Sequence, residues 1–416
     1  METRKGPPWA RVVRRFLERA GPGFVKLGQV LSVRPDLVPD SLRRELEALQ
    51  DRAVPVPWGH VRAEIERALG PGAGAVFRRV VPQPVASASV AQVHRAETPD
   101  GRPLAVKVLR PGVEERVLRN LRLARRLAPV LGLCPALRGR VDADALWGEL
   151  ERAARAELDL RSEGETACEL ARGLRDEPRI RIPEVYWPGT ARRVLSAEWI
   201  EGHKLSAPEA RRHPEYRDLA ETGARAFFRQ VLELGLFHAD LHPANLLITP
   251  AGEIGYVDFG LRGRLGPGER RAALGVLVGL LARDAGLALR SLERLGVRVP
   301  RERRASFVEE VDRVLGAALR PRLEEVELAA MGLGLLGAAR RAGVRFPHRH
   351  ALLVKALLSI EGTARLLHPG FSLERCAGEY LAERTLETLR PGLVLEAAWR
   401  GAALLGLGRL CADLTA

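Results

Sequence analysis

Residues 238–245 read His-Ala-Asp-Leu-His-Pro-Ala-Asn, and residues 257–260 read Val-Asp-Phe-Gly. Within them, Asp240 is placed to meet a substrate hydroxyl, Asn245 follows five residues later, and Asp258 follows thirteen residues after that. Phosphoryl transfer from a magnesium nucleotide requires this polar set: a carboxylate for the hydroxyl and oxygen ligands for the magnesium ions that bridge the phosphates. Each residue alone is common in turns, but their joint spacing makes a merely structural role improbable. The two stretches therefore predict a kinase-type site.

The surrounding sequence predicts an exposed loop between a helix and two short strands. Apolar runs at residues 246–248 and 254–257 have the length of short strands. We expect the loop before them to be fully exposed, with Asp240 accepting or orienting the attacking hydroxyl. His238 or His242 is expected to brace the loop.

A kinase site also needs a lysine on an upstream strand that covers the nucleotide. Residues 104–109 read as a strand, and Lys107 lies in it within an Ala-Val-Lys-Val run, 133 residues before Asp240. A lone lysine in a strand is more often a surface residue, but this setting favours a catalytic one. Lys107 is therefore expected to contact the nucleotide phosphates and to pair with a glutamate on a helix.

An alanine-rich segment stands where a protein kinase has a glycine-rich flap. Residues 84–91 read Pro-Val-Ala-Ser-Ala-Ser-Val-Ala, and no glycine lies between Ala75 and Asp100. Alanine does not readily take the positive φ that lets a backbone close over phosphates. We therefore expect a flap that is stiffer than a glycine-rich one and differently placed. Its predicted nucleotide-contacting residues are Ala86, Ser87, Ala88 and Ser89.

Length and composition agree with a two-lobed protein that meets phosphates. The chain has 416 residues, which is long for one small core. Its net charge of +14 favours phosphate-bearing partners such as nucleotides and anionic lipids, although an arginine-rich proteome would give the same balance. Aromatic residues make up only 5% of the chain and no zinc-finger spacing occurs. We therefore expect no nucleic-acid partner.

Cysteine use and hydropathy favour a reduced compartment and no membrane span. Four cysteines are scattered without metal-site spacing, as in reduced proteins inside the cell, and residues 1–15 lack the apolar core of a signal peptide. The most apolar runs, residues 273–282, 328–339 and 401–408, fall short of the roughly 18 to 20 uncharged residues that cross a bilayer. We expect packed core helices, with shallow membrane contact as the alternative.

The predicted secondary structure changes twice along the chain. Residues 1–75 show helical spacing, residues 76–198 mix strands with inserted helices, and residues 199–416 are mostly helical. In the middle part, continuous helices are expected at residues 112–131 and 141–171. The predicted fold class is α+β: a two-lobed, protein-kinase-like fold with an N-terminal helical extension and an enlarged helical C-lobe.

Several separate stretches match one known family in order. They are Lys-Leu-Gly-Gln at residues 26–29, the alanine-rich loop with Ala-Gln-Val-His at 91–94, Ala-Val-Lys at 105–107, Arg-Pro-Gly at 110–112, Glu-Leu-Asp at 157–159 and the two catalytic stretches. On these residues the chain resembles the UbiB/AarF/ADCK atypical kinases, a family linked to quinone biosynthesis whose signature is the motif KxGQ. The resemblance covers roughly residues 20–265.

The resemblance implies regulatory roles that spacing alone does not assign. Lys26 and Gln29 would belong to a KxGQ segment that packs over the site where a protein substrate would bind. Lys26 would reach in to contact Glu157 and Asp159. Without the motif, these carboxylates would read as a solvated acidic face beside arginines.

The resemblance also implies how the nucleotide is held. Glu163, four residues after Asp159 and on the same helix face, would be the partner of Lys107. Adenine would meet backbone groups at the hinge, at Glu198 and Ile200. The expected cofactors are ATP or ADP with Mg²⁺.

As for activity, the resemblance implies slow ATP hydrolysis or small-molecule phosphorylation rather than protein phosphorylation, in support of ubiquinone or another isoprenoid quinone. Expected partners are anionic membrane lipids, hydrophobic quinone precursors and quinone-biosynthesis enzymes. The expected location is cytoplasmic and peripheral, at the inner face of the cell membrane, without a transmembrane helix.

The sequence departs from the family pattern in places. Ser87 adds a hydroxyl where many members continue a run of alanines, and Thr166 stands where asparagine is common. The two C-terminal hydrophobic spans of many bacterial members are missing or too short, which puts integral anchoring in doubt.

Two other function classes remain open. A small-molecule phosphotransferase of the aminoglycoside or choline kinase type shares the His-x-Asp-x-x-x-x-Asn loop, but residues 26–29 argue against it because that class lacks a KxGQ cap. A non-catalytic regulator switched by nucleotide is disfavoured because every predicted phosphate-binding and metal-binding position is intact.

Overall fold

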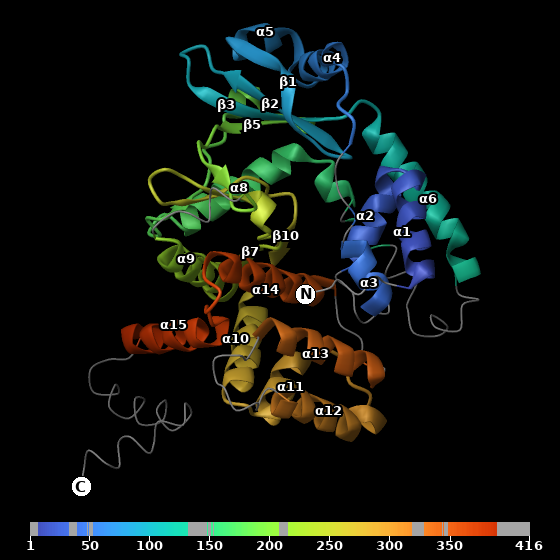
Figure 1. The fold of residues 1–416 in the computed structure, drawn as a ribbon, viewed down its shortest axis with the longest axis vertical. Helices are drawn as coiled ribbons and strands as arrows, with labels where there is room; N and C mark the ends of the chain where they lie inside the picture. The colour runs from blue at the N-terminus through green and yellow to red at the C-terminus, as the bar shows by residue number, and fades with distance from the viewer. Residues whose placement is uncertain are drawn as a thin grey trace. The chain divides into compact units, whose positions relative to one another are not determined.

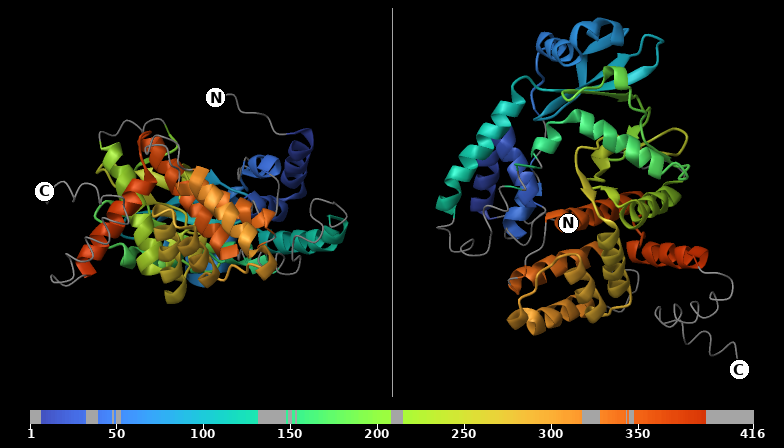
Figure 2. Two further views of the ribbon diagram at one scale, coloured as in Figure 1. Left: turned by 90° about the horizontal axis from the view of Figure 1, so that it is seen from below. Right: turned by 180° about the vertical axis from the view of Figure 1, so that it is seen from behind.

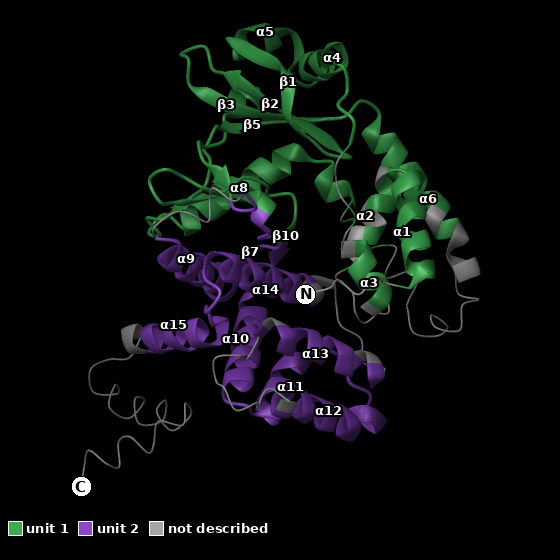
Figure 3. Cartoon of the chain, in the orientation of Figure 1, with its two compact units in different colours: residues 1–204, 244–262 green, residues 205–243, 263–416 purple. Residues whose placement is uncertain are grey.

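The computed structural model describes residues 7–32, 40–47, 49, 53–131, 148, 151–152, 154–207, 215–317, 328–342, 344 and 348–388. The chain divides into two compact units (Figure 3): unit 1 comprises residues 1–204 and 244–262, and unit 2 comprises residues 205–243 and 263–416. The two stretches that predict the kinase-type site, residues 238–245 (the phosphotransfer loop) and 257–260, are together called the phosphotransfer stretch, and they are shared between the units. Asp240 belongs to unit 2, whereas Asn245 and Asp258 belong to unit 1.

Unit 1 contains a group of helices that pack on one another (Figure 1): α1 (Pro8–Ala20), α2 (Pro22–Ser32), α3 (Asp40–Glu47) and α6 (Val113–Leu131). Pro8 and Pro22 open the first two helices, where proline sacrifices no helical hydrogen bond. Gly28 is buried where α2 meets its neighbours. A Cβ on it would come within 2.3 Å of Leu49 Cδ1 and 3.0 Å of Leu17 Cδ1. The glycine of the KxGQ motif is therefore explained by close packing.

The main sheet of unit 1 has strand order β1-β2-β3-β5, with antiparallel neighbours: β1 (Arg79–Ser87), β2 (Ala91–Glu97), β3 (Pro103–Leu109) and β5 (Val194–Glu198). Helices α4 (Trp58–Leu69) and α5 (Ala73–Val76) lie beside it in Figure 1. Val61 and Ile65 of α4 pack with Val106 and Val108 in one buried cluster. Because side chains alternate along a strand, Lys107 points to the opposite face of the sheet.

A second sheet in unit 1 carries the segment that leads to Asp258. Its order is β4-β9-β8-β6: β4 (Ile180–Arg181), β6 (His203–Lys204), β8 (Leu246–Ile248) and β9 (Ile254–Tyr256). The turn between β8 and β9 uses Gly252, whose φ is 75° and whose N–H donates to the carbonyl of Thr249 at 3.0 Å. Helix α8 (Leu160–Gly173) packs against β5 of the main sheet. Its first turn carries Glu163.

Unit 2 begins with α9 (Tyr216–Arg229), which continues as a π-helical segment, Gln230–Leu234. Gly235 ends it in the left-handed conformation, with φ 68°, which a side chain would disfavour. Strand β7 (Leu236–His238) follows, paired with β10 (Arg262–Arg264). The turn at Gly235 thus directs the chain through β7 into the phosphotransfer loop.

The rest of unit 2 is helical (Figure 2): α10 (Pro267–Leu281), α11 (Ala285–Arg294), α12 (Arg304–Ala317), α13 (Leu328–Arg341), α14 (His348–Leu367) and α15 (Leu373–Thr388). Helix α14 packs against α9 and α13. An apolar cavity of about 100 Å³ lies among these helices, lined by residues that include Leu277, Leu335 and Leu353. Within the described parts of the chain, no helix combines the length and apolarity needed to span a bilayer. The apolar run at residues 401–408 lies outside the described residues.

The structure confirms the predicted fold class and the helix over residues 112–131, but not every element. The continuous helix expected over residues 141–171 is wrong, because residues 158 and 159 are not helical. Asp159 instead caps α8, its carboxylate accepting the N–H of Ser162 at 3.1 Å. The predicted domain boundaries at residues 75 and 198 stay predictions.

Candidate functional site

Three charged side chains from distant parts of unit 1 meet in one cluster. Lys107 Nζ lies 2.8 and 2.9 Å from the two carboxylate oxygens of Glu163 and 3.3 Å from Oδ1 of Asp258. The exposed fraction of the side chain rises from 3% at Glu163 to 23% at Lys107 and 44% at Asp258. The cluster is thus closed at the glutamate and open to a ligand at Asp258.

The electrostatics of the cluster keep Lys107 charged. Burial lowers the pKa of Lys107, but the charges of Asp258 and Glu163 outweigh it, so the pKa is raised above its ordinary value of 10.5. Burial raises the pKa of Glu163, and the charge of Lys107 offsets part of that rise. The result is a fixed ammonium beside an accessible carboxylate.

The backbone of the Asp-Phe-Gly segment orients both carboxylates. The N–H of Phe259 donates to Oε1 of Glu163 at 3.2 Å, and the N–H of Gly260 donates to Oδ1 of Asp258 at 3.0 Å. The segment therefore fixes Asp258 by its own turn and ties itself to helix α8.

Asn245 and Asp258 lie at the same end of the β8–β9 hairpin. Leu246 pairs with Tyr256, and the N–H of Val257 donates to the carbonyl of Asn245 at 3.1 Å. The amide and carboxylate oxygens of these two residues are hard ligands of the kind that Mg²⁺ prefers. Among the described residues, no group of three or more His, Cys, Asp or Glu side chains forms a metal site.

The alanine-rich segment closes a tight connection between β1 and β2. Ala86 and Ser87 pair with Val93 and Gln92, and the N–H of Ala88 donates to the carbonyl of Ala91 at 2.9 Å. Among the described non-glycine residues, positive φ occurs at Arg283 alone, so the segment turns without left-handed backbone. Contact of Ala86–Ser89 with nucleotide stays a prediction.

Arg110 pins this segment, a role that the sequence did not suggest. Its Nε donates to the carbonyl of Ala88 and its Nη2 to Oγ of Ser87, both at 2.7 Å. Nη2 also donates to the carbonyl of Val54 at 2.8 Å. The available signals were its position directly after strand β3 and its place in the Arg-Pro-Gly stretch that matches the family, and neither assigned it this contact. The added hydroxyl of Ser87 thus serves this clamp.

The hinge residues have structural partners. The carboxylate of Glu198 pairs with Arg181 and accepts the N–H of Glu184 at 3.3 Å. Ile200 packs over Gly255, where a Cβ would come within 3.1 Å of Ile200 Cγ2. These contacts fix the course of the hinge; its role in adenine binding stays a prediction.

The Ala-Gln-Val-His run joins the sheet to the segment before α4. The side-chain amide of Gln92 pairs with both backbone groups of Val56. The ring centroids of His94 and Trp58 lie 5.4 Å apart with the ring planes tilted by 50°, and Nδ1 of His94 donates to the carbonyl of Val81 at 2.9 Å. Nε2 of His94 therefore accepts from the Gln92 amide at 3.3 Å. Burial lowers the pKa of His94 and keeps the ring neutral.

In unit 2, the phosphotransfer loop is more enclosed than expected. The prediction of a fully exposed loop is wrong, since His238 and Leu241 are buried and Asp240 is partly buried. The N–H of His238 donates to Oε1 of the buried Gln230 at 2.9 Å, and the N–H of Asp240 donates to Nδ1 of His238 at 3.0 Å. Of the two histidines expected to brace the loop, His238 makes this bond to its backbone.

Helix α14 adds two contacts that the sequence did not reveal. Lys355 Nζ lies 2.8 Å from Oδ1 of Asp240. Oγ1 of Thr363 donates to the carbonyl of Leu241 at 2.8 Å. No local pattern marks either residue, because both meet the loop only through helix packing.

Comparison with known proteins identifies this set of residues. The sequence matches the ABC1 atypical kinase-like domain over residues 48–291 and the UbiB helical domain over residues 311–372. The chain belongs to the ABC1/UbiB family of atypical kinases. The first match holds Lys107, Glu163, Asp240 and Asp258, and the second holds Lys355.

Relatives and a solved structure agree with the ABC1/UbiB assignment. A probable protein kinase UbiB from Marinobacter nauticus is 34% identical, over 92% of this chain and 71% of that protein. The chloroplastic protein ACTIVITY OF BC1 COMPLEX KINASE 3 from Arabidopsis thaliana is 33% identical, over 92% of this chain and 54% of that protein. The structure of Rv3197 with erythromycin from Mycobacterium tuberculosis has a TM-score of 0.50 and 28% identity, covering 84% of this chain and 93% of that one.

The ABC1/UbiB signature KxGQ lies in α2. The side chains of Lys26 and Gln29 lie outside the described residues, so the contact of Lys26 with Glu157 and Asp159 and the regulatory role of Gln29 stay predictions. The expectation that Asp159 and Glu163 share one helix face is wrong, because Asp159 caps α8 with non-helical φ −121° and ψ 87°. Glu163 nevertheless meets Lys107, because it lies in the first turn of α8, which packs against β5, the neighbour of β3.

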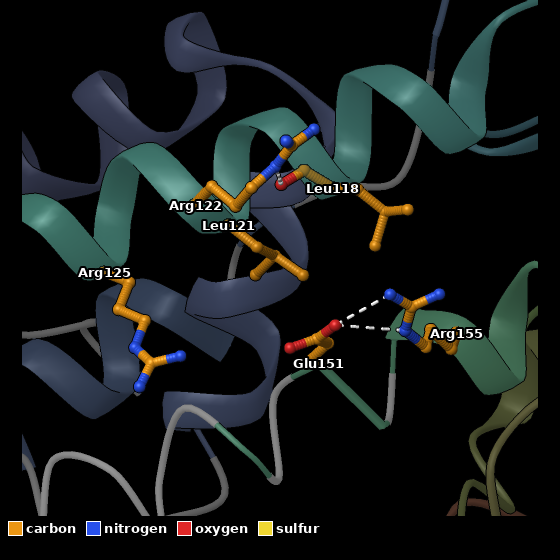
Figure 4. Close-up of a pocket in the computed structure, with 6 residues that line it drawn as sticks. All are labelled: Leu118, Leu121, Arg122, Arg125, Glu151 and Arg155. Atoms are coloured by element: carbon orange, nitrogen blue, oxygen red, sulfur yellow. Dashed lines mark hydrogen bonds and ion pairs between the residues drawn. The ribbon is translucent and has the colours of Figure 1, made fainter.

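Unit 1 of this ABC1/UbiB protein also has a hollow (Figure 4). Its volume is about 340 Å³ and its lining residues are Leu118, Leu121, Arg122, Arg125, Glu151 and Arg155. Two of its polar side chains satisfy each other, because Arg155 donates to Glu151 at 2.8 Å. The hollow contains none of the residues predicted to bind nucleotide.

Proposed function

We propose that the chain is an atypical kinase or ATPase that binds Mg-ATP or Mg-ADP and supports the biosynthesis of an isoprenoid quinone at the membrane. The observation that carries the proposal is the cluster of Lys107, Glu163 and Asp258, with Asn245 at the same end of the hairpin. It matches the lysine–glutamate pair and the metal-binding aspartate on which kinase activity depends.

The residues present fit a magnesium nucleotide. Lys107 Nζ lies within 2.9 Å of both carboxylate oxygens of Glu163. Asp258 is 44% exposed, and its Oδ1 lies at the longer distance of 3.3 Å from the ammonium. A magnesium ion held by Asp258 and Asn245, and a phosphate held by Lys107, would replace that weaker contact without breaking the pair with Glu163. When bound, the ion neutralises phosphate charge.

The other residues orient and enclose. Lys107 is charged at physiological pH, since its pKa is raised by its two carboxylate neighbours in spite of burial, and it therefore binds phosphate without proton transfer. Ala86–Ser89, clamped by Arg110, would cover the phosphates as a rigid flap. Asp240 would accept or orient the attacking hydroxyl or water.

The quinone role rests on the family and on the names of its members. Two relatives at 34% identity, from Marinobacter nauticus and Cellvibrio japonicus, are described as probable protein kinase UbiB. A net charge of +14 supports attraction to anionic lipids at the inner face of the cell membrane. Hydrophobic quinone precursors and quinone-biosynthesis enzymes would meet the protein there.

The test separates nucleotide binding from turnover. Asp258→Asn is expected to abolish the thermal stabilisation by Mg-ATP, whereas Asp240→Asn is expected to retain it and to lower phosphate release by about 10²- to 10⁴-fold. Asp100→Asn is the matched control, because Asp100 is an exposed turn residue whose carboxylate pairs with Arg102 at 2.9 Å. Stabilisation of Asp258→Asn equal to that of wild type would refute the site assignment.

The quinone role has its own measurement. In a strain that carries Asp240→Asn at the native locus, the mature quinone is expected to fall and a prenylated precursor to accumulate. An unchanged lipid profile beside lost ATP turnover would remove the quinone role and leave the kinase assignment intact.

A further inference from the structure

Helix α14 holds the phosphotransfer loop at two successive residues. Lys355 Nζ contacts Oδ1 of Asp240, and Oγ1 of Thr363 donates to the carbonyl of Leu241, both at 2.8 Å. The two donors are about two helical turns apart. One contact is to a side chain and the other to the backbone, so they restrain different degrees of freedom.

The backbone of the loop is held by hydrogen bonds that do not involve Lys355. Gln230 accepts the N–H of His238, and His238 in turn accepts the N–H of Asp240. Together with Thr363, these bonds fix the chain on both sides of the Asp240 carboxylate. The contribution of Lys355 is therefore concentrated on the orientation of that carboxylate.

Lys355 stands on a rigid support. Its neighbour Ala356 is fully buried, and α14 packs against α9 and α13. Leu353, Val354 and Leu357, on the same turns, line the apolar cavity of unit 2. The lysine side chain itself is 23% exposed and Asp240 is 32% exposed. A lysine anchored in this way can set the direction of a carboxylate that is still open to a substrate.

We propose that Lys355 is a positioning residue for phosphoryl transfer: by engaging Oδ1 of Asp240, it sets the orientation in which that carboxylate meets the attacking hydroxyl or water. This inference rests on the proposed function. In the step it serves, the attacking oxygen bonds to the γ-phosphorus, the bond to the bridging oxygen breaks with its electron pair leaving on the nucleoside diphosphate, and the proton passes to Asp240. The UbiB helical domain is thereby part of the reaction apparatus, because it supplies this residue.

The test compares charge-matched variants of the full chain in Mg-ATP turnover. Lys355→Met is expected to lower kcat by about tenfold or more while KM for Mg-ATP stays within about twofold, since misplacement of a reacting group costs rate rather than nucleotide affinity. Lys355→Arg, which keeps the charge, is expected to recover part of kcat. Arg375→Met removes one charge from the exposed pair with Glu379 on α15 and is expected to match wild type.

A double-mutant cycle identifies the partner. If Lys355 acts through Asp240, Lys355→Met causes no further loss in the Asp240→Asn background. A further loss of tenfold would show that Lys355 acts elsewhere and would overturn the proposal. So would equal kcat values for Lys355→Met and Arg375→Met in an otherwise active protein.

If the proposed function itself is wrong, the experiment gives a different result. In that case wild type itself shows no turnover above Asp240→Asn, and the inference about Lys355 falls with it. Thermal denaturation of each variant, without nucleotide, separates loss of positioning from loss of folded protein. Lys355→Arg supplies the comparison should Lys355→Met fold poorly.

Discussion

Two aspartates of the phosphotransfer stretch each pair with a lysine, but the pairs are built differently. Asp258 shares Lys107 with the buried Glu163, at 3.3 Å, inside unit 1. Asp240 pairs with Lys355 at 2.8 Å inside unit 2. The first pair is backed by Glu163, whose side chain is 3% exposed, whereas both members of the second pair are partly exposed and are brought together by helix packing. A pair that includes a buried charge contributes to the stability of the folded protein. A partly exposed pair contributes little stability and can act by orienting a side chain.

The largest expected difference between the pairs is therefore in stability. Lys107→Met leaves Glu163, which is 3% exposed, as a buried charge without its ammonium, and breaking such a pair costs about 3 to 5 kcal/mol. Lys355→Met affects side chains that are 23% and 32% exposed, for which about 1 kcal/mol or less is expected. Native-state hydrogen exchange, read in β3 and α8 for the first variant and in α14 for the second, measures both.

Adding Glu163→Gln to Lys107→Met is the internal control. The second substitution removes the unpaired carboxylate, so it is expected to restore part of the lost stability. Equal destabilisation by Lys107→Met and Lys355→Met would contradict the distinction between the two pairs. The pKa of Lys107 is raised in the folded state, so its contribution is fully present below pH 10.5, its ordinary pKa, and is lost only as pH rises through the folded value.

The same contrast explains how much of the site could be predicted from the sequence. Lys107 and Asp258 are set in patterns whose spacing is fixed by chemistry, so composition and order sufficed to find them. Glu163 required the resemblance to a family, because a glutamate on a helix carries no local mark. Lys355 could not be found, since it lies more than a hundred residues beyond Asp240 and only tertiary packing brings them together.

For the fold as well, elements marked by local sequence patterns could be predicted, whereas features that depend on single contacts could not. Apolar alternation and turn residues located strand β3, and helical spacing located α6. The break at Asp159 was missed because apolar spacing continues across it, while the capping bond that ends one helix and starts the next depends on a single carboxylate. The enclosure of His238 was missed because it depends on Gln230, which meets the loop only through the π-helical segment that the sequence did not indicate.

A smaller effect is expected from pH, and it should appear in unit 1. The pKa of His94 is lowered by burial against Trp58. Folding therefore holds the ring neutral, and its stabilising contribution, complete above pH 6.5, is lost as pH falls below that ordinary value toward the folded one. Acidification from about pH 7.5 to 5.5 is expected to lower the hydrogen-exchange protection factors of β1 and β2, in which the intrinsic pH dependence of exchange has been divided out. His94→Gln, which cannot titrate, should flatten this dependence; an unchanged slope would show that another group causes it.

The smallest expected change sharpens the account of the loop. Thr363→Val keeps the shape of the side chain but removes the donor to the carbonyl of Leu241, which is buried. Loss of one such hydrogen bond costs about 1 kcal/mol, measurable as faster hydrogen exchange in α14. Because Lys355 still engages Asp240, kcat should fall less than in Lys355→Met. If Thr363→Val lowers kcat as much as Lys355→Met, the backbone of the loop rather than the orientation of its carboxylate limits the reaction, and the contrast between the two lysines reduces to the burial of Glu163 beside Lys107.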